Sequence, residues 1–175
     1  MEMILFTILG VLSRLTPHPA NMTAVAGASL FVSAKYGIKK GLIVMLATML
    51  ISDSVKGLHS VMWATYGALF LTVCIGVFIG SKRNAGWVIG GTMLSSVLFF
   101  IITNFAVWLA PHFMYPRTLT GLIECYTMAI PFFRNTVIGD LFYSGVFFGG
   151  FAFVHNIKQQ YGIEKVRQFL NIYKG

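Results

Sequence analysis

The sequence predicts an all-α integral membrane protein, a bundle of six transmembrane helices followed by an amphipathic C-terminal helix. Two observations predict this fold class. Hydrophobic residues make up 57% of the 175 residues and charged residues only 10%, whereas about a quarter of an ordinary soluble domain is charged. In addition, apolar runs alternate with turn residues and basic residues. This is the pattern of membrane-spanning helices, because lipid accepts only apolar side chains and an internally paired backbone.

Six apolar runs are the expected spans. They cover residues 3–15, 21–34, 41–52, 61–79, 86–110 and 136–154. The second is rich in alanine, glycine and serine, which let helices approach closely. The fifth is long enough to cross with tilt. Residues 111–135 are expected to form a long connector before the sixth helix.

The first run permits a second interpretation. It is short and ends before the motif Thr16-Pro17-His18-Pro19, so the apolar core of a signal peptide is an alternative. However, the run begins with the acidic Glu2, and no small-residue cleavage site precedes the prolines. These features favour a helix that stays in the protein.

The C-terminal segment has a different pattern. Charged residues alternate there with apolar residues at helical spacing, namely Ile163, Val166, Phe169, Leu170 and Tyr173. Such a stripe is typical of an amphipathic helix that lies on a membrane surface. We therefore expect a six-helix transmembrane domain at residues 1–157 and a cytoplasmic amphipathic tail at residues 158–175.

Basic residues set the expected orientation, because lysine and arginine are retained on the cytoplasmic side of a membrane. With six crossings, the loops after the second and fourth helices share one side with the C-terminal tail. That side holds nine basic residues: Lys35, Lys39, Lys40, Lys82, Arg83, Lys158, Lys165, Arg167 and Lys174. The opposite side holds four: Arg14, Lys56, Arg117 and Arg134. Both termini are therefore predicted to be cytoplasmic, and the lipid bilayer is the first partner.

Several function classes have no support in the sequence. The net charge of +8 comes from short basic groups between apolar runs, so no nucleic-acid partner is expected. Cys74 and Cys125 cannot build a disulfide scaffold and lack metal-ligand spacing. The chain has no HExxH, GxSxG or P-loop motif, so it cannot energise transport with ATP by itself. No cofactor is expected.

Unusual polar residues collect on the side predicted to face outward. They follow the first, third and fifth helices, whereas the inner loops carry little besides lysine and arginine. Charged groups near membrane depth cost at least a few kcal/mol each, so they pair with one another or line a polar cavity. The candidate substrate-binding residues are His18, Asn21, Asp53, His59, Trp63, Tyr66, Asn104, Tyr115, Arg117, Tyr126, Arg134, Asn135 and Asp140.

Ion pairs are the structural alternative for the charged residues of this set. Asp53 can cap a helix or pair with Lys56 in a wet loop. Arg134 can pair with Asp140 and so close the connector onto the sixth helix. His18 lies between two prolines, which hold its imidazole in a set direction and favour a role in the site.

Aromatic and amide side chains also have two interpretations. His59 shares a helical face with Trp63 if the fourth helix begins early. The tryptophan and tyrosine residues either form an aromatic belt at the level of the lipid head groups or stack on a flat ligand. Asn104 lies within an apolar helix, where an amide needs a partner, either another helix or a substrate.

Four segments resemble a known family. They are PHPANMTAVAGASLF (17–31), SDSVKGLHSVMWATYG (52–67), TNFAVWL (103–109) and YPRTLTGLIECYTMAIPFFRNTVIGDLF (115–142). These segments are similar to those of small bacterial membrane proteins related to the S-components of energy-coupling-factor (ECF) vitamin transporters, the BtuM-like group of solitary cobalamin transporters. The resemblance spans most of the chain between residues 17 and 142.

The resemblance implies an S-component-like bundle in the bacterial inner (cytoplasmic) membrane. It implies that the loops after the first, third and fifth helices cap a cavity for a vitamin-like micronutrient, such as cobalamin or a related compound. By analogy, His18, Asp53 and residues 115–140 supply the pocket. Cobalamin-specific members ligate cobalt with a cysteine at a position close to Tyr66, and Cys74 lies too far along the chain. His18 or His59 is then the alternative metal ligand.

The resemblance also concerns the partner. S-components dock on an energy-coupling module through an Ala-xxx-Ala face of the first helix. Here that helix offers only Thr7, Gly10 and Ser13. Small residues permit close packing without reproducing the motif, so the protein either docks in a modified way or acts alone.

Taken together, the sequence favours a substrate-binding transport protein that takes up a small-molecule nutrient through a pocket under the outer loops. The alternative is a membrane enzyme that acts on a lipid or small molecule with Glu124, Asp140, Arg134 and His18. A structural partner protein without a ligand is the third interpretation.

Overall fold

The computed structural model describes residues 2–80, 82, 84–110 and 114–172, with side-chain surroundings as far as residue 162. The helices are α1 Glu2–Leu15, α2 Val25–Tyr36, α3 Ile38–Lys56, α4 Met62–Gly80, α5 Ala85–Leu109 and α6 Leu119–Ile172. The described residues contain no β-strand. The described part of the protein is therefore all-α, as the sequence predicts, and the expected sixth span and C-terminal helix form the single helix α6.

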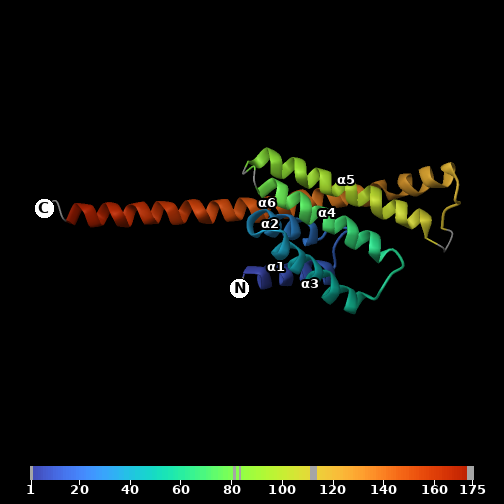
Figure 1. Ribbon diagram of the computed structural model, residues 1–175, viewed down its shortest axis with the longest axis horizontal. Coiled ribbons are helices and arrows are strands. Elements are labelled where there is room, and N and C mark those ends of the chain that lie inside the picture. Colours follow the sequence, from blue (N-terminus) through green and yellow to red (C-terminus); the bar gives the residue numbers. More distant parts are fainter. Residues whose placement is uncertain (1, 81, 83, 111–113, 173–175) are drawn as a thin grey trace.

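The helices lie side by side along the long axis of the molecule (Figure 1). The loop between α3 and α4 and the connector between α5 and α6 lie at one end, which we call the loop end. The N-terminus and the α4–α5 turn lie toward the opposite end. This arrangement brings two of the loops that carry predicted site residues to the same end of the bundle.

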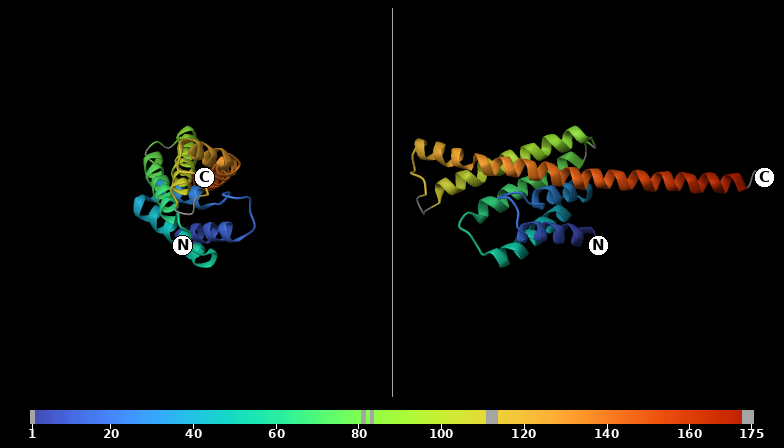
Figure 2. Two further views of the ribbon diagram at one scale, coloured as in Figure 1. Left: turned by 90° about the vertical axis from the view of Figure 1, so that its right-hand side faces the viewer. Right: turned by 180° about the vertical axis from the view of Figure 1, so that it is seen from behind.

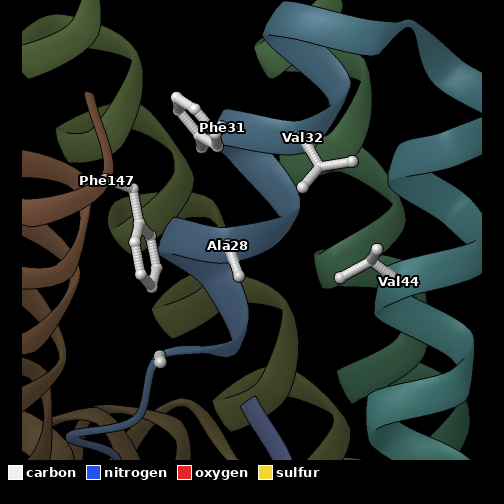
Figure 3. Close-up of a cluster of buried hydrophobic side chains, with 6 residues drawn as sticks. Ala28, Phe31, Val32, Val44 and Phe147 are labelled. Carbon is white, nitrogen blue, oxygen red and sulfur yellow. The ribbon is translucent and has the colours of Figure 1, made fainter. Parts of the chain in front are cut away.

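The short helix α2 lies at the centre of the bundle and contacts each of the other five helices. Eight of its twelve residues are buried. Ala28, Phe31 and Val32 pack against Val44 of α3 and Phe147 of α6 (Figure 3). The small residues of α2 allow the neighbouring helices to pack closely against it. This central helix also contributes to the wall of the cavity described below.

Three helices are long and apolar enough to cross a membrane. Among the described residues these are α4, α5 and residues 119–162 of α6. With 14 and 12 residues, α1 and α2 are about 21 and 18 Å long, shorter than the hydrocarbon core of a bilayer at about 30 Å. The chain therefore has the character of a membrane protein, but among the described residues only three helices, and not the six predicted spans, are long and apolar enough to cross a membrane.

Gly37 forms the whole connection between α2 and α3. Its φ of 87° lies in the left-handed region, as does the φ of 92° at Gly57, which ends α3. A residue with a Cβ atom is strained there, whereas glycine is not. These two glycines set the sharp corners that return the chain into the bundle.

The predicted long connector at residues 111–135 is wrong. Helix α6 begins at Leu119 and contains Pro131, so polar residues that suggested a loop belong to a helix. A proline is tolerated within a membrane-embedded helix because neighbouring groups can satisfy the freed carbonyl. The connector that remains is short.

Helix α6 also continues through the predicted boundary between residues 157 and 158. It runs without a break to Ile172, and its C-terminal half projects beyond the other five helices (Figure 2). The side chains of the predicted apolar stripe from Ile163 to Leu170 lie outside the described surroundings. Arg83, Tyr173 and Lys174, which the sequence analysis also used, lie outside the described residues.

Candidate functional site

A cavity of about 340 Å³ opens among the helices toward the loop end. The α1–α2 loop contributes His18 and Asn21, the α3–α4 loop contributes His59, and α6 contributes Asp140. These four predicted site residues are therefore brought together, although they come from three separate parts of the chain. The complete lining is Arg14, His18, Ala20, Asn21, Thr23, Val25, Ala26, Met49, Lys56, His59, Thr65, Leu69, Thr72, Ser95, Phe99, Thr136 and Asp140.

A second cavity of about 270 Å³ adjoins the first. The two share Ala20, Asn21, Thr65, Phe99 and Thr136 in their walls. We call the first the polar lobe and the second the aromatic lobe, because three phenylalanine rings line the latter in addition to Phe99. The remaining lining of the aromatic lobe is Phe100, Thr103, Asn104, Val107, Ala129, Phe132 and Phe133.

Asp140 is the buried acid of the polar lobe. It is only 4% exposed, and one of its oxygens, Oδ2, accepts a hydrogen bond of 2.7 Å from Ser96 Oγ on α5. One turn further along, Thr92 Oγ1 lies 3.2 Å from Ser144 Oγ. No basic side chain of the described residues lies within ion-pair distance of Asp140. The predicted pair with Arg134 is wrong, because six residues of helix separate the two and place them on different faces.

Asp53 is held in a network that joins α1, α3 and α4. Arg14 Nη2 lies 2.6 Å from Asp53 Oδ1, and the Tyr66 hydroxyl donates to Asp53 Oδ2 at 2.9 Å. The predicted pair of Asp53 with Lys56 is wrong, since Lys56 Nζ donates instead to the carbonyl oxygen of Arg14 at 2.8 Å. Because Arg14 lines the polar lobe, this network fixes one wall of the cavity.

The two histidines of the predicted site, His18 and His59, are loop residues. His18 Nδ1 lies 2.6 Å from the carbonyl oxygen of Thr16, a short contact that orients the imidazole beside the cavity. His59 precedes α4, which begins only at Met62. The predicted helical face shared by His59 and Trp63 is therefore absent, and Trp63 is 64% exposed.

The family of the chain follows from its sequence over nearly its whole length. A family described as being of unknown function, DUF6580, matches residues 1–164. The protein belongs to the DUF6580 family. No curated protein matches the chain, and no solved structure does. The function of this DUF6580 protein therefore has to be argued from its site.

The DUF6580 chain keeps several other predicted residues away from the polar lobe. Asn104 lines the aromatic lobe, and its amide donates to the carbonyl oxygen of Phe100 at 2.7 Å. The Tyr126 hydroxyl donates to the carbonyl oxygen of Ile101 at 2.7 Å, while Arg117 donates to that of Leu109 at 3.0 Å. The predicted residues outside both linings are Asp53, Trp63, Tyr66, Tyr115, Arg117, Tyr126, Arg134 and Asn135.

Hydroxyl side chains of the DUF6580 protein line the cavity where the sequence analysis named none. Ser95 and Thr136 line the polar lobe, and Ser96 binds Asp140. A signal was present: Thr92 and Ser96 on α5, and Thr136, Asp140 and Ser144 on α6, recur four residues apart within apolar helices. Polar residues at this spacing share one helix face. The sequence could therefore have predicted that the polar face of α5 packs against the polar face of α6.

The acid–base couple of the enzyme interpretation is widely separated in this DUF6580 protein. Glu124 and Asp140 lie on one continuous helix, sixteen residues and thus about 24 Å apart. Glu124 is exposed, whereas Asp140 is buried. The two carboxyl groups therefore cannot act on one bond. Among the described residues, no three His, Cys, Asp or Glu side chains are placed to hold a metal ion.

Proposed function

We propose that the protein is a substrate-binding membrane transport protein of S-component type, which takes up a vitamin-like micronutrient. The observation that supports this proposal most is the two-lobed cavity beneath the loops that charge asymmetry assigns to the outer side. Small-molecule sites occupy about 300–1,000 Å³ and combine apolar walls with a few polar groups. The polar lobe of about 340 Å³ lies within this range, and the adjoining aromatic lobe adds about 270 Å³.

The size of the lobes favours a compact solute. Cobalamin, to which the family resemblance points, is bulkier than the two lobes of about 340 and 270 Å³ taken together. A smaller organic micronutrient is therefore the substrate we propose. Its flat or aliphatic part would occupy the aromatic lobe, where Phe100 and Phe133 pack with ring centroids 4.6 Å apart.

The polar lobe has opposite charges at its two depths. Lys56 and His59 are exposed at the opening, whereas Asp140 is buried. The first turn of α2 also lines the lobe through Val25 and Ala26, and its N-cap residue Ala24 offers the amide groups of this turn no side-chain acceptor. Free amide groups there add positive potential. A substrate that carries both a hydrogen-bond acceptor or negative group and a donor or positive group matches this distribution of charge better than a hydrocarbon does.

Transport requires a place in the membrane and a movement. We place all six helices across the bacterial inner membrane, with α4, α5 and α6 as full-length crossings, α1, α2 and α3 as shorter ones, and both termini in the cytoplasm. The chain has no P-loop, so an energy-coupling module or an ion gradient must drive uptake. A cavity open toward one side can release its substrate on the other only if the bundle or its loops move.

The proposal is tested by the molecule that the cavity retains. We expect mass spectrometry of the purified, denatured wild-type protein to find one small organic compound in a constant ratio to the chain. Ala20 is exposed and lines both lobes, so Ala20→Trp should place an indole ring in their shared wall. We expect retention to fall at least about tenfold with a change in Tm below about 2 °C.

The matched control is Ala152→Trp, an exposed alanine on α6 that lines neither lobe. It should retain the compound as the wild-type protein does. Equal retention in both variants would show that the compound lies elsewhere. A protein that carries no compound and gives cells no uptake would end the transport proposal.

The orientation has its own test. Lys39 and Lys82 are exposed near the end opposite the loop end, and single cysteines there, with Cys74 and Cys125 replaced by serine, should react with a membrane-impermeant maleimide only after cells are opened. A cysteine at Leu58, which is 81% exposed at the loop end, should react in intact cells. Labelling of Lys39→Cys in intact cells would reverse the proposed orientation.

A further inference from the structure

A small internal space lies behind the polar lobe, between α2, α4, α5 and α6. Asp140 and Ser95 line both the lobe and this space. Thr72, Thr92 and Ser144 complete its polar lining, and the space has no room for a water molecule. One carboxyl group and four hydroxyl groups therefore line a space that is too small for water.

Two of the four hydroxyl groups, those of Thr72 and Thr92, are available to a ligand as acceptors. Thr72 donates to the carbonyl oxygen of Ala68 at 3.2 Å, and Thr92 donates to that of Val88 at 2.8 Å. A hydroxyl group has only one hydrogen to donate. With their hydrogens held by the backbone, these two oxygens can offer only lone pairs to a ligand.

Ser95 is the second observation that points to a ligand. It is 3% exposed, and its Oγ atom has no hydrogen-bond partner among the described residues. Burying a hydroxyl group without a hydrogen-bond partner is unfavourable. Its sequence neighbour Ser96 donates a hydrogen bond to Asp140, and Ser95 and Asp140 line the same space.

Asp140 itself lacks a counter-charge. Its partner Ser96 is neutral, and the described residues provide no basic side chain within ion-pair distance. The arginine and the lysine that line the polar lobe are engaged elsewhere: Arg14 binds Asp53, and Lys56 donates to the carbonyl oxygen of Arg14. A carboxylate in the interior of a membrane protein needs a positive partner.

We propose that Asp140, with the oxygens of Ser95, Thr92, Ser144 and Thr72, forms a binding site for a single positive charge. One carboxylate balances one monovalent cation, whereas Ca²⁺ takes several carboxylates and six to eight oxygens. The charge is either a bare sodium ion, which is smaller than water, or the basic nitrogen of the substrate in the adjoining lobe. The inference deepens the proposed function, because it assigns the lobe either a coupling ion or a cationic substrate class.

The test is a series of melting curves of the full-length protein in detergent micelles, at constant ionic strength. The probes are NaCl against N-methyl-D-glucamine chloride, and benzylammonium chloride against neutral benzyl alcohol. We expect one of the two cations to raise Tm by about 5 °C at saturation. A rise with sodium identifies a coupling ion, and a rise with benzylammonium alone identifies a cationic substrate.

Asp140→Asn should abolish that rise, because an amide keeps the shape of the side chain without its charge. Glu124→Gln, an exposed acid on the same helix, should leave the rise unchanged. If neither cation raises Tm in the wild-type protein, Asp140 is kept neutral by its own proton and the inference is wrong. Retention of a compound in that case would leave the transport proposal intact.

Ser95→Ala separates a ligand from a structural role. The substitution removes an unpaired hydroxyl group, so it should not lower Tm in the absence of cation, yet it should weaken the apparent affinity for the cation about tenfold. The control is Ser29→Ala, since Ser29 Oγ is also buried and unpaired but lines neither lobe nor the internal space. Equal cation affinity in Ser95→Ala and the wild-type protein would overturn the proposed coordination.

Discussion

Asp53→Asn should destabilise the protein by about 3–5 kcal/mol, the largest effect that we expect from a single substitution. The change removes the charge that holds Arg14, whose side chain is 14% exposed, and leaves a guanidinium group without its partner. The hydroxyl group of Tyr66 loses its charged acceptor at the same time. A fall in Tm of about 10 °C in detergent micelles is the measurable result.

A double-mutant cycle gives the control. Arg14→Met should also be destabilising, because it leaves Asp53 buried without a counter-charge, but Arg14→Met combined with Asp53→Asn should recover much of the loss. Lys56→Met removes a charge from an exposed side chain and should change Tm by less than about 2 °C. Additive losses in the double variant would contradict the assigned ion pair.

Gly76→Ala should destabilise the protein by about 1–3 kcal/mol through the contact between α2 and α4. A Cβ atom at this position would lie 2.0 Å from Ser33 Oγ and 2.5 Å from the carbonyl oxygen of Leu30. The serine side chain can rotate away, but the Leu30 carbonyl belongs to the backbone of the central helix. The two helices must therefore separate, which we expect to lower Tm by about 3–8 °C.

Gly67→Ala is the matched control within the same helix. A Cβ atom there meets no other atom within 4 Å, and alanine is the better helix former by about 1 kcal/mol. This variant should melt at the wild-type temperature or slightly above it. Equal losses in both variants would mean that helix propensity, and not the approach of α4 to α2, determines the result.

The sequence predicts the class and order of the elements well, because both depend on local patterns. The apolar runs at residues 21–34 and 41–52 became α2 and α3, whose limits differ from the expected ones by two to four residues at each end. The segment before residue 136 was misjudged for a physical reason. Glu124, Pro131 and Arg134 are typical of loops, yet here they are exposed residues of a helix.

The site could be predicted in part. Four of the predicted residues line the polar lobe, namely His18, Asn21, His59 and Asp140. They were predictable because outward loops and a charged residue within an apolar run can be recognised in the sequence. The partners were not predictable, since they depend on how the helices rotate against one another. Arg14 was counted only as an orientation signal, yet it reaches Asp53, 39 residues away in the chain.

The length of α6 gives the molecule a long rigid arm. Asp140 and the end of the helix at Ile172 belong to one uninterrupted rod, and the 32 residues between them span about 48 Å. A tilt of a few degrees at the floor of the cavity would therefore sweep the far tip through several ångströms. In the proposed orientation, a substrate that tilts α6 at the pocket near the outer surface of the bilayer would thereby move the end of this helix on the cytoplasmic side.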